Sequence, residues 1–205
     1  GKILSASRRT DIPAFYMDWF MDRVYQGAFE VTNPVNRKKN IVSCDSSSIH
    51  TIVFWSKNFS RFLAGNDPDR LTGRGYQFYF NFTLNSKNSC LEPHLPPLPD
   101  RLRQLAVLAE RYGPDCIAWR FDPICFYHDG NPMNEQNNLG DFEQIAKSAA
   151  VAGIKKCVTS FLDVYRKIDR RLNRYNQKNG SSLVFTSPPA ALRARVIKQM
   201  TVILQ

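Results

Sequence analysis

Short apolar runs alternate along the chain with stretches in which apolar residues recur at helical spacing. The runs have the length and the β-branched or aromatic content of strands. Six of them are predicted strands, at residues 2–6, 28–32, 49–55, 77–84, 116–121 and 156–161, and residues 183–186 are a candidate seventh. Helical spacing covers the intervening segments 13–26, 102–112 and 142–149, a basic stretch at 166–178 and the chain from about residue 189.

Strands that alternate with helices are typical of a parallel sheet covered by helices. A complete barrel of eight such units takes about 250 residues, whereas this chain has 205. We therefore predict a single α/β domain over residues 1–205, an incomplete TIM-like (β/α) barrel of about six parallel strands with outer helices. The final run VIKQMTVILQ is helical in character and has no cap or breaker, so we expect the native polypeptide to continue beyond Gln205.

Each predicted strand is followed by polar or charged residues. The carboxyl ends of parallel strands lie at one edge of a sheet, and that edge holds the active site in parallel α/β proteins, so we expect these residues to form one rim. The predicted catalytic residues are Asp11, Lys57 and Asp122, and the predicted anion-binding residues are Ser7, Arg8, Arg9, Asn33, Asn58, Thr83, Arg120, Ser160 and Asp163. The cations among them suit a clamp for phosphate or carboxylate, and the aspartates suit a general base.

Several of these residues have a second interpretation that concerns structure alone. The alternatives are a helix cap for Asp11, mutual pairing for Arg120 and Asp122, a solvated loop for Lys57 and a turn for Asn33. Cys125, three residues before His128, is a candidate nucleophile. Free cysteines are more often small buried hydrophobes, and we favour that interpretation for Cys125.

The positive charge of the chain is concentrated near its end. The formal net charge is +10, and residues 155–205 contribute +9 of it, with eleven Lys and Arg against two Asp and Glu. Within this part, the segment 166–178 interleaves Lys and Arg with tyrosine, a pattern that contacts with a nucleic-acid backbone would use. The alternatives are a solvated helix face, or a face that meets an acidic segment of a longer chain.

The cysteine content and the absence of several known motifs exclude some classes of protein. Five cysteines without a close pair favour a reducing compartment, and no secretory signal or membrane-length apolar run is present, so we predict a cytoplasmic protein without membrane contact. Phosphate-binding loops, dinucleotide-binding glycine motifs, nucleophile elbows and HExxH are absent. The histidines and cysteines lack the spacing of a zinc site, so no metal ligand is predicted.

The strings at the strand ends resemble those of the domain-of-unknown-function 1848 family. The similar segments, in order through about Lys167, are ILSASRRTDIPAFY, NP, VFWSKN, FTL, WRFDPI and SFLDVYRK. The family looks related to radical S-adenosylmethionine enzymes, with a cysteine cluster near the C-terminus proposed to hold an iron–sulfur cluster. Some members resemble the spore photoproduct lyases, which act on DNA. None of the five cysteines here matches that cluster, so the resemblance implies both cofactors only for a longer polypeptide.

Three hypotheses follow from the sequence. The first is an enzyme domain, radical S-adenosylmethionine-like in its full-length form, whose rim binds an anionic substrate or cofactor. The second is a module that binds or modifies nucleic acid through the segment 166–178. The third, a scaffold without chemistry, is the least favoured because every predicted strand ends in polar groups. The expected partners are thus an anionic small molecule or nucleic acid, together with the missing C-terminal segment of the same chain.

Overall fold

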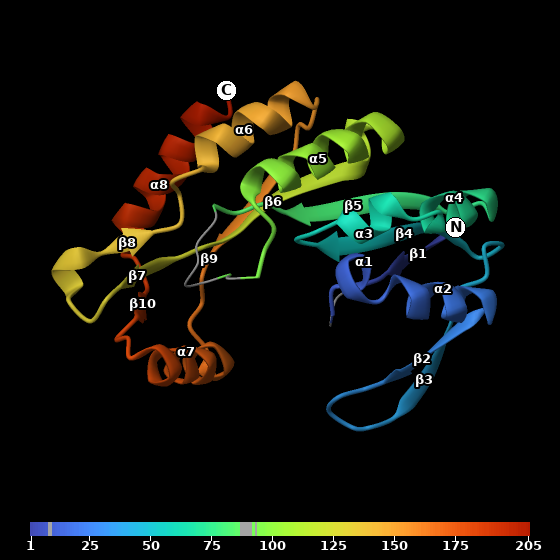
Figure 1. The fold of residues 1–205 in the computed structure, drawn as a ribbon, viewed down its shortest axis with the longest axis horizontal. Coiled ribbons are helices and arrows are strands. Elements are labelled where there is room, and N and C mark those ends of the chain that lie inside the picture. Colours follow the sequence, from blue (N-terminus) through green and yellow to red (C-terminus); the bar gives the residue numbers. More distant parts are fainter. Residues whose placement is uncertain (8–9, 87–91, 93) are drawn as a thin grey trace.

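Five parallel strands form the central sheet of the computed structural model, which describes residues 1–7, 10–86, 92 and 94–205. The strands lie side by side in chain order (Figure 1), and they are β1 (Lys2–Ser5), β4 (Ile49–Ser56), β5 (Gln77–Thr83), β6 (Ile117–Ile124) and β9 (Cys157–Phe161). The sheet curls into a half-barrel, and its carboxyl ends meet at one edge. The α/β class and the partial barrel are therefore confirmed, but a six-stranded TIM-like barrel is not.

The second predicted strand exists, but it lies outside the parallel sheet. Strand β2 (Ala28–Thr32) pairs antiparallel with β3 (Lys39–Ser43) in a separate hairpin. A parallel crossover needs a dozen or more residues, and residues 33–38 are too few to provide one. The candidate seventh strand, β10 (Val184–Thr186), also pairs antiparallel, with β7 (Phe126–His128), which in turn pairs with β8 (Gln136–Asn137).

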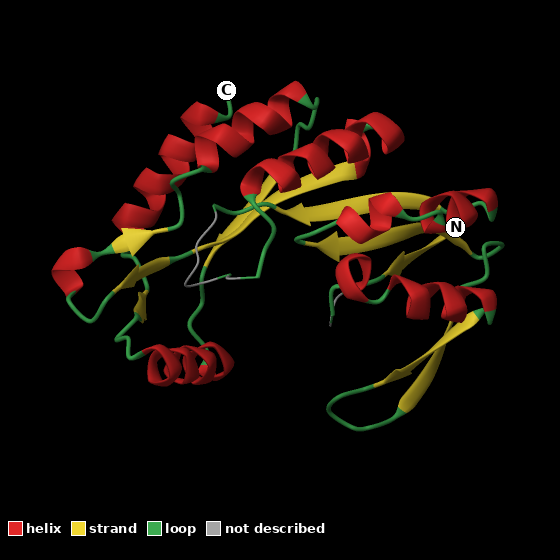
Figure 2. Cartoon of the chain, viewed as in Figure 1, coloured by secondary structure: helices red, strands yellow, loops and turns green. Residues whose placement is uncertain are grey.

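The helices form an outer layer around the convex face of the sheet, apart from α7 (Figure 2). They are α1 (Ile12–Phe15), α2 (Met17–Tyr25), α3 (Ser60–Ala64), α4 (Asp67–Gly73), α5 (Leu98–Tyr112), α6 (Phe142–Val151), α7 (Arg166–Asn179) and α8 (Ala190–Ile203), with 3₁₀ turns at Pro114–Cys116 and Pro132–Asn134. Within the described ranges, no helix combines the length and the apolar character that crossing a membrane requires.

The core is an aromatic layer between the sheet and these helices. Phe62 of α3 is fully buried, with ring centroids 5.3 Å from Phe54 of β4 and 5.7 and 5.6 Å from Phe78 and Phe80 of β5. Further along the sheet, Trp119 of β6 stacks on Phe142 of α6 at 5.3 Å. Edge-to-face contacts of this kind stabilise the fold beyond the area that they bury.

Burial of this layer places a different set of side chains on the opposite face. Successive residues of a strand point to opposite faces, and the residues that flank Phe54, Phe80 and Phe82 therefore face away from the helices. The register pairs Trp55 with Asn81 and Thr83 with Arg120, which puts these four on the concave face near the carboxyl edge. The packing of the aromatic layer thus determines which side chains of these strands lie on the concave face.

We expect Phe62→Ala to lower the free energy of unfolding by about 3–5 kcal/mol, because it leaves a cavity at the centre of the aromatic layer. Urea denaturation measures this change. The control is Phe15→Ala, since Phe15 is 70% exposed and its loss should change stability by no more than about 0.5 kcal/mol. Equal effects of the two substitutions would contradict this description of the core.

Candidate functional site

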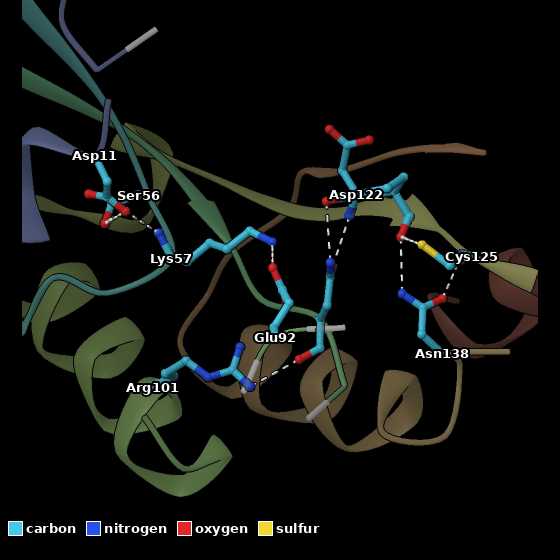
Figure 3. A network of polar contacts seen from close by, with 10 residues as sticks. Asp11, Ser56, Lys57, Glu92, Arg101, Asp122, Cys125 and Asn138 are labelled. Atoms are coloured by element: carbon cyan, nitrogen blue, oxygen red, sulfur yellow. Dashed lines mark hydrogen bonds and ion pairs between the residues drawn. The ribbon is translucent and has the colours of Figure 1, made fainter. Parts of the chain in front are cut away.

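A network of hydrogen bonds centred on Asp122 organises the carboxyl edge, and Figure 3 shows the contacts of its main chain beside Lys57, Glu92 and Arg101. The carboxylate pairs with the guanidinium of Arg120 and accepts a hydrogen bond from the hydroxyl of Ser160. The main-chain N–H of Asp122 donates to Asn85 Oδ1 at 3.0 Å, and Asn85 Nδ2 donates to the carbonyl of Asp122 at 3.2 Å. The β6–β9 register shifts between Phe121 and Ile124, and such irregularities re-aim side chains at the ends of strands.

Asn85 is held in place by a buried arginine. Arg101 of α5 is fully buried, and its Nη2 and Nε donate to the carbonyls of Asn85 and Pro96 at 3.1 and 3.2 Å. Burial lowers the pKa of this guanidinium, and its Nη1 has no hydrogen-bond partner among the described residues. Sequence analysis did not single out Arg101, although it lies one helical turn before Leu105 on the buried side of α5.

Arg120 is fixed on its other side by an aromatic ring. Its guanidinium carbon lies 4.8 Å from the ring centroid of Trp55, a cation–π distance. The pairing of Arg120 with Asp122, given above as the alternative to a ligand-binding role, is therefore the arrangement in this structure. On the same edge, Trp55 Nε1 and Ser7 Oγ are buried polar atoms without a partner among the described residues.

Asp11 caps helix α1 and joins it to the end of β4. Its Oδ1 accepts from the main-chain N–H of Ala14 at 3.1 Å. Its Oδ2 accepts from the hydroxyl of Ser56 at 2.9 Å and from the main-chain N–H of Lys57 at 3.2 Å. Burial raises the pKa of this carboxyl. Asp11 thus fixes the backbone from which the Lys57 side chain projects, and the helix-cap interpretation describes its contacts.

Lys57 carries a partly buried amine at this edge. Its Nζ pairs with the carboxylate of Glu92, and the two side chains are 34% and 23% exposed. Burial lowers the pKa of the amine to about 8.

The thiol of Cys125 lines the same cavity. Burial raises its pKa to about 11, so it is protonated at neutral pH. Asn138 holds the loop around Cys125, accepting from the Cys125 main-chain N–H at 2.9 Å and donating to the carbonyl of Pro123 at 3.0 Å.

A cavity of about 350 Å³ lies between this edge and helix α7. Its polar lining consists of Lys57, Asn85, Ser86, Glu92, Asn138 and Arg171, and its apolar lining of Pro123, Cys125, Leu162, Ile168, Leu172, Tyr175, Leu183 and Phe185. The two cations and the one carboxylate in this lining give it a formal charge of +1. Such a site, mostly apolar with a few polar groups, is typical of small-molecule pockets.

The predicted site residues are only partly brought together. Lys57 lines the cavity, while Asp122, Arg120 and Ser160 form the adjoining network and Thr83 pairs in register with Arg120. Asn58 Oδ1 accepts from the N–H of Ser60 at the start of α3, and Asp163 is exposed after β9. The expectation that Asn33 lies at the rim is wrong, because it forms the β2–β3 turn, with Oδ1 accepting from the N–H of Val35 at 2.9 Å. Arg8 and Arg9 lie outside the described residues.

Two cavity residues could not be assigned from the sequence. Glu92 lies in the proline-rich segment before α5, and Arg171 lies among other basic residues of α7, so neither follows a strand. Arg171 belongs to the same side of α7 as Ile168, Leu172 and Tyr175, which line the cavity with it. The helical spacing of those three apolar residues is the signal that marks this side of the helix as the inner one.

The described residues do not form a metal centre. They contain no group of three or more His, Cys, Asp or Glu side chains placed to hold an ion. The cysteines Cys44, Cys116, Cys125 and Cys157 are free thiols, and Cys90 lies outside the described residues. These residues therefore do not fit an iron–sulfur cluster.

Comparison with known proteins places the chain in a family. The family model described as "Domain of unknown function (DUF1848)" matches residues 3–205, so the chain belongs to the DUF1848 family. No curated protein and no solved structure matches it.

We expect Asp122→Asn to lower the free energy of unfolding by about 2–3 kcal/mol, because the amide cannot accept from Ser160 and pair with the half-buried Arg120 at once. Urea denaturation measures the loss. The matched control is Glu30→Gln, which removes the carboxylate of an exposed pair with Lys39 and should cost less than about 1 kcal/mol. A loss at Asp122 no larger than at Glu30 would show that the network does not hold the edge together.

Proposed function

For this member of the DUF1848 family, we propose an enzyme domain that binds an anionic substrate or cofactor in the cavity between the carboxyl edge of the half-barrel and α7. One observation carries the proposal: Lys57 and Arg171 reach the same apolar-walled cavity from two different elements, and among the described lining residues only Glu92 carries a carboxylate. An anionic ligand would bring the cavity to neutrality.

The position of the two cations supports an extended ligand with an apolar body. Lys57 reaches the cavity from the end of β4, and Arg171 reaches it from α7. Leu172 and Tyr175 from α7 and Phe185 from β10 supply apolar and aromatic surface. A low-dielectric wall strengthens the attraction between a ligand anion and a nearby guanidinium.

The chemistry that this site offers is proton transfer at Lys57. A pKa of about 8 lets the amine exist in both protonation states near neutral pH, which is what a general acid or base requires. Asp11 and Asp122, predicted above as catalytic, have their carboxylate oxygens occupied by hydrogen bonds within the chain. We assign them the role of positioning residues.

Radical S-adenosylmethionine chemistry remains a prediction for a longer polypeptide. The half-barrel is compatible with it, but the described residues do not fit an iron–sulfur cluster. No step of the proposed function therefore runs through that cluster or through S-adenosylmethionine.

Nucleic-acid binding is the second candidate function, and the outer face of α7 favours it. Arg166, Arg170, Arg174 and Lys178 recur every four residues, and all four are exposed. Among the described residues none of them forms an ion pair with an acidic side chain. A row of exposed cations is the usual contact for phosphates. This row of cations does not line the cavity, which takes Ile168, Arg171, Leu172 and Tyr175 from the same helix, so the two functions are compatible.

We expect 8-anilinonaphthalene-1-sulfonate, an aromatic anion whose fluorescence rises in apolar sites, to bind the cavity. Lys57→Met and Arg171→Met should each weaken its affinity about five- to tenfold, equivalent to about 1–1.4 kcal/mol, because each removes one of the cations that line the cavity. Fluorescence titration measures the dissociation constant, and near-ultraviolet circular dichroism verifies that each variant is folded.

Arg174→Met is the matched control for Arg171→Met, since it removes the same side chain from the outer face of the same helix. Its affinity for the probe should be unchanged. If the probe binds the Arg171 and Arg174 variants equally well, the cavity is not the anion site.

For the second candidate, replacing Arg170, Arg174 and Lys178 together with alanine should weaken binding to duplex DNA and flatten its salt dependence. The slope of log K against log salt falls by about 0.9 for each phosphate contact that is lost. The control removes the same charge elsewhere, through Lys38→Ala, Lys39→Ala and Lys147→Ala. If both triple variants change the slope equally, α7 makes no specific contact with the nucleic acid.

A further inference from the structure

The amine of Lys57 is held at the cavity by a rigid support. The main chain at Lys57 is tied to Asp11 by its N–H, and the preceding Ser56 donates to the same carboxylate and accepts from the N–H of Asn58. These bonds fix the end of β4, so the lysine side chain extends from a defined point into the space that Glu92 and Cys125 also line (Figure 3). A nucleophile needs positioning of this kind.

The surroundings of Nζ favour reactivity of the amine over the thiol. Among the described residues, the charged and titratable groups around it are Glu92, Cys125, Asp122, Asp11 and Arg101, with Arg171 at the same cavity. With a pKa of about 8, roughly a quarter of the amine is neutral at pH 7.5, against about 0.1% for an ordinary lysine. The pKa of about 11 at Cys125 leaves that thiol protonated and weakly nucleophilic.

The remaining lining defines what an electrophile must carry. Arg171 offers a guanidinium for an anionic group, and Leu172 and Phe185 offer apolar surface for the body of the ligand. A lysine amine in a partly apolar site reacts with aldehydes and ketones. A ligand that fits all three features has a carbonyl, an apolar or aromatic body and an anionic group.

We propose that Lys57 is the covalent nucleophile of this site and forms an imine with an aldehyde or ketone that carries an aromatic or apolar body and an anionic group. This inference rests on the proposed function, and it adds a covalent role for Lys57 and the substrate class.

The step balances with the groups present. The ammonium of Lys57 gives one proton to the carboxylate of Glu92, with which it is paired. The free electron pair of Nζ forms a bond to the carbonyl carbon, the π pair moves to oxygen, and a proton passes from nitrogen to oxygen to give the carbinolamine. The nitrogen pair then forms the C=N bond while the hydroxyl leaves as water with the proton from Glu92. The products are a protonated imine and one water, and no oxidant or reductant is consumed.

Reductive trapping tests this inference. The chain is incubated with pyridoxal 5′-phosphate, an aromatic aldehyde with a phosphate, as a probe of the class, reduced with borohydride and mapped by peptide mass spectrometry. We expect labelling of Lys57 well ahead of the exposed Lys39 and Lys147, with the extent of labelling rising to half its maximum near pH 8. Arg171→Met should reduce the label at Lys57 about fivefold, whereas Arg174→Met should leave it unchanged.

Two outcomes separate this inference from the proposed function. If the naphthalenesulfonate binds the cavity but Lys57 is labelled no faster than Lys39, the imine is overturned and the anion site stands. If neither probe engages the cavity, both proposals fail. Lys57→Arg removes the primary amine, so the label should disappear from the peptide that contains position 57 while circular dichroism shows an intact fold. Label that persists on this peptide in the variant would overturn the assignment of the imine to Lys57.

Discussion

The alternation of side chains along each parallel strand is the constraint on which the rest of this structure depends. Phe54, Phe80 and Trp119 are buried on one face against the helices, and the residues next to them in sequence are thereby fixed on the other face. A slip of one residue in register would exchange the two sets. The aromatic packing consequently determines which polar side chains lie at the carboxyl edge, and it does so without any direct contact between the aromatic layer and a ligand.

The site is built outward from that edge in two steps. Arg101 and Asn85 first hold the backbone of Asp122 through bonds of 3.0–3.2 Å, and Asp122 in turn fixes Arg120 and Ser160. Helix α7 then forms the opposite wall of the cavity with its apolar side and Arg171, while Arg166, Arg170, Arg174 and Lys178 are exposed to solvent. One amphipathic helix therefore accounts for two features that look independent in the sequence, a basic segment and an apolar wall above the strand ends.

Sequence patterns predicted the local parts of this arrangement better than the distant ones. The five parallel strands and the cap at Asp11 follow from local periodicity and residue type. Residues 28–32 were predicted to belong to the parallel sheet, whereas they pair with β3 in an antiparallel hairpin. The sequence of β3, KNIVS, is short and wholly exposed, so it was not predicted as a strand and the hairpin was missed. Glu92 and Arg171 reach the cavity through tertiary packing of a loop and a helix. The spacing of Ile168, Leu172 and Tyr175 marks the inner side of that helix, but it does not show which part of the fold that side meets, and no pattern marks Glu92.

A crystal structure of the chain with bound 8-anilinonaphthalene-1-sulfonate would show whether the space between the sheet edge and α7 receives an anionic ligand. We expect the aromatic rings against Leu172 and Phe185 and the sulfonate beside the guanidinium of Arg171. A probe bound on another surface, or a cavity filled by side chains of the protein itself, would contradict this expectation.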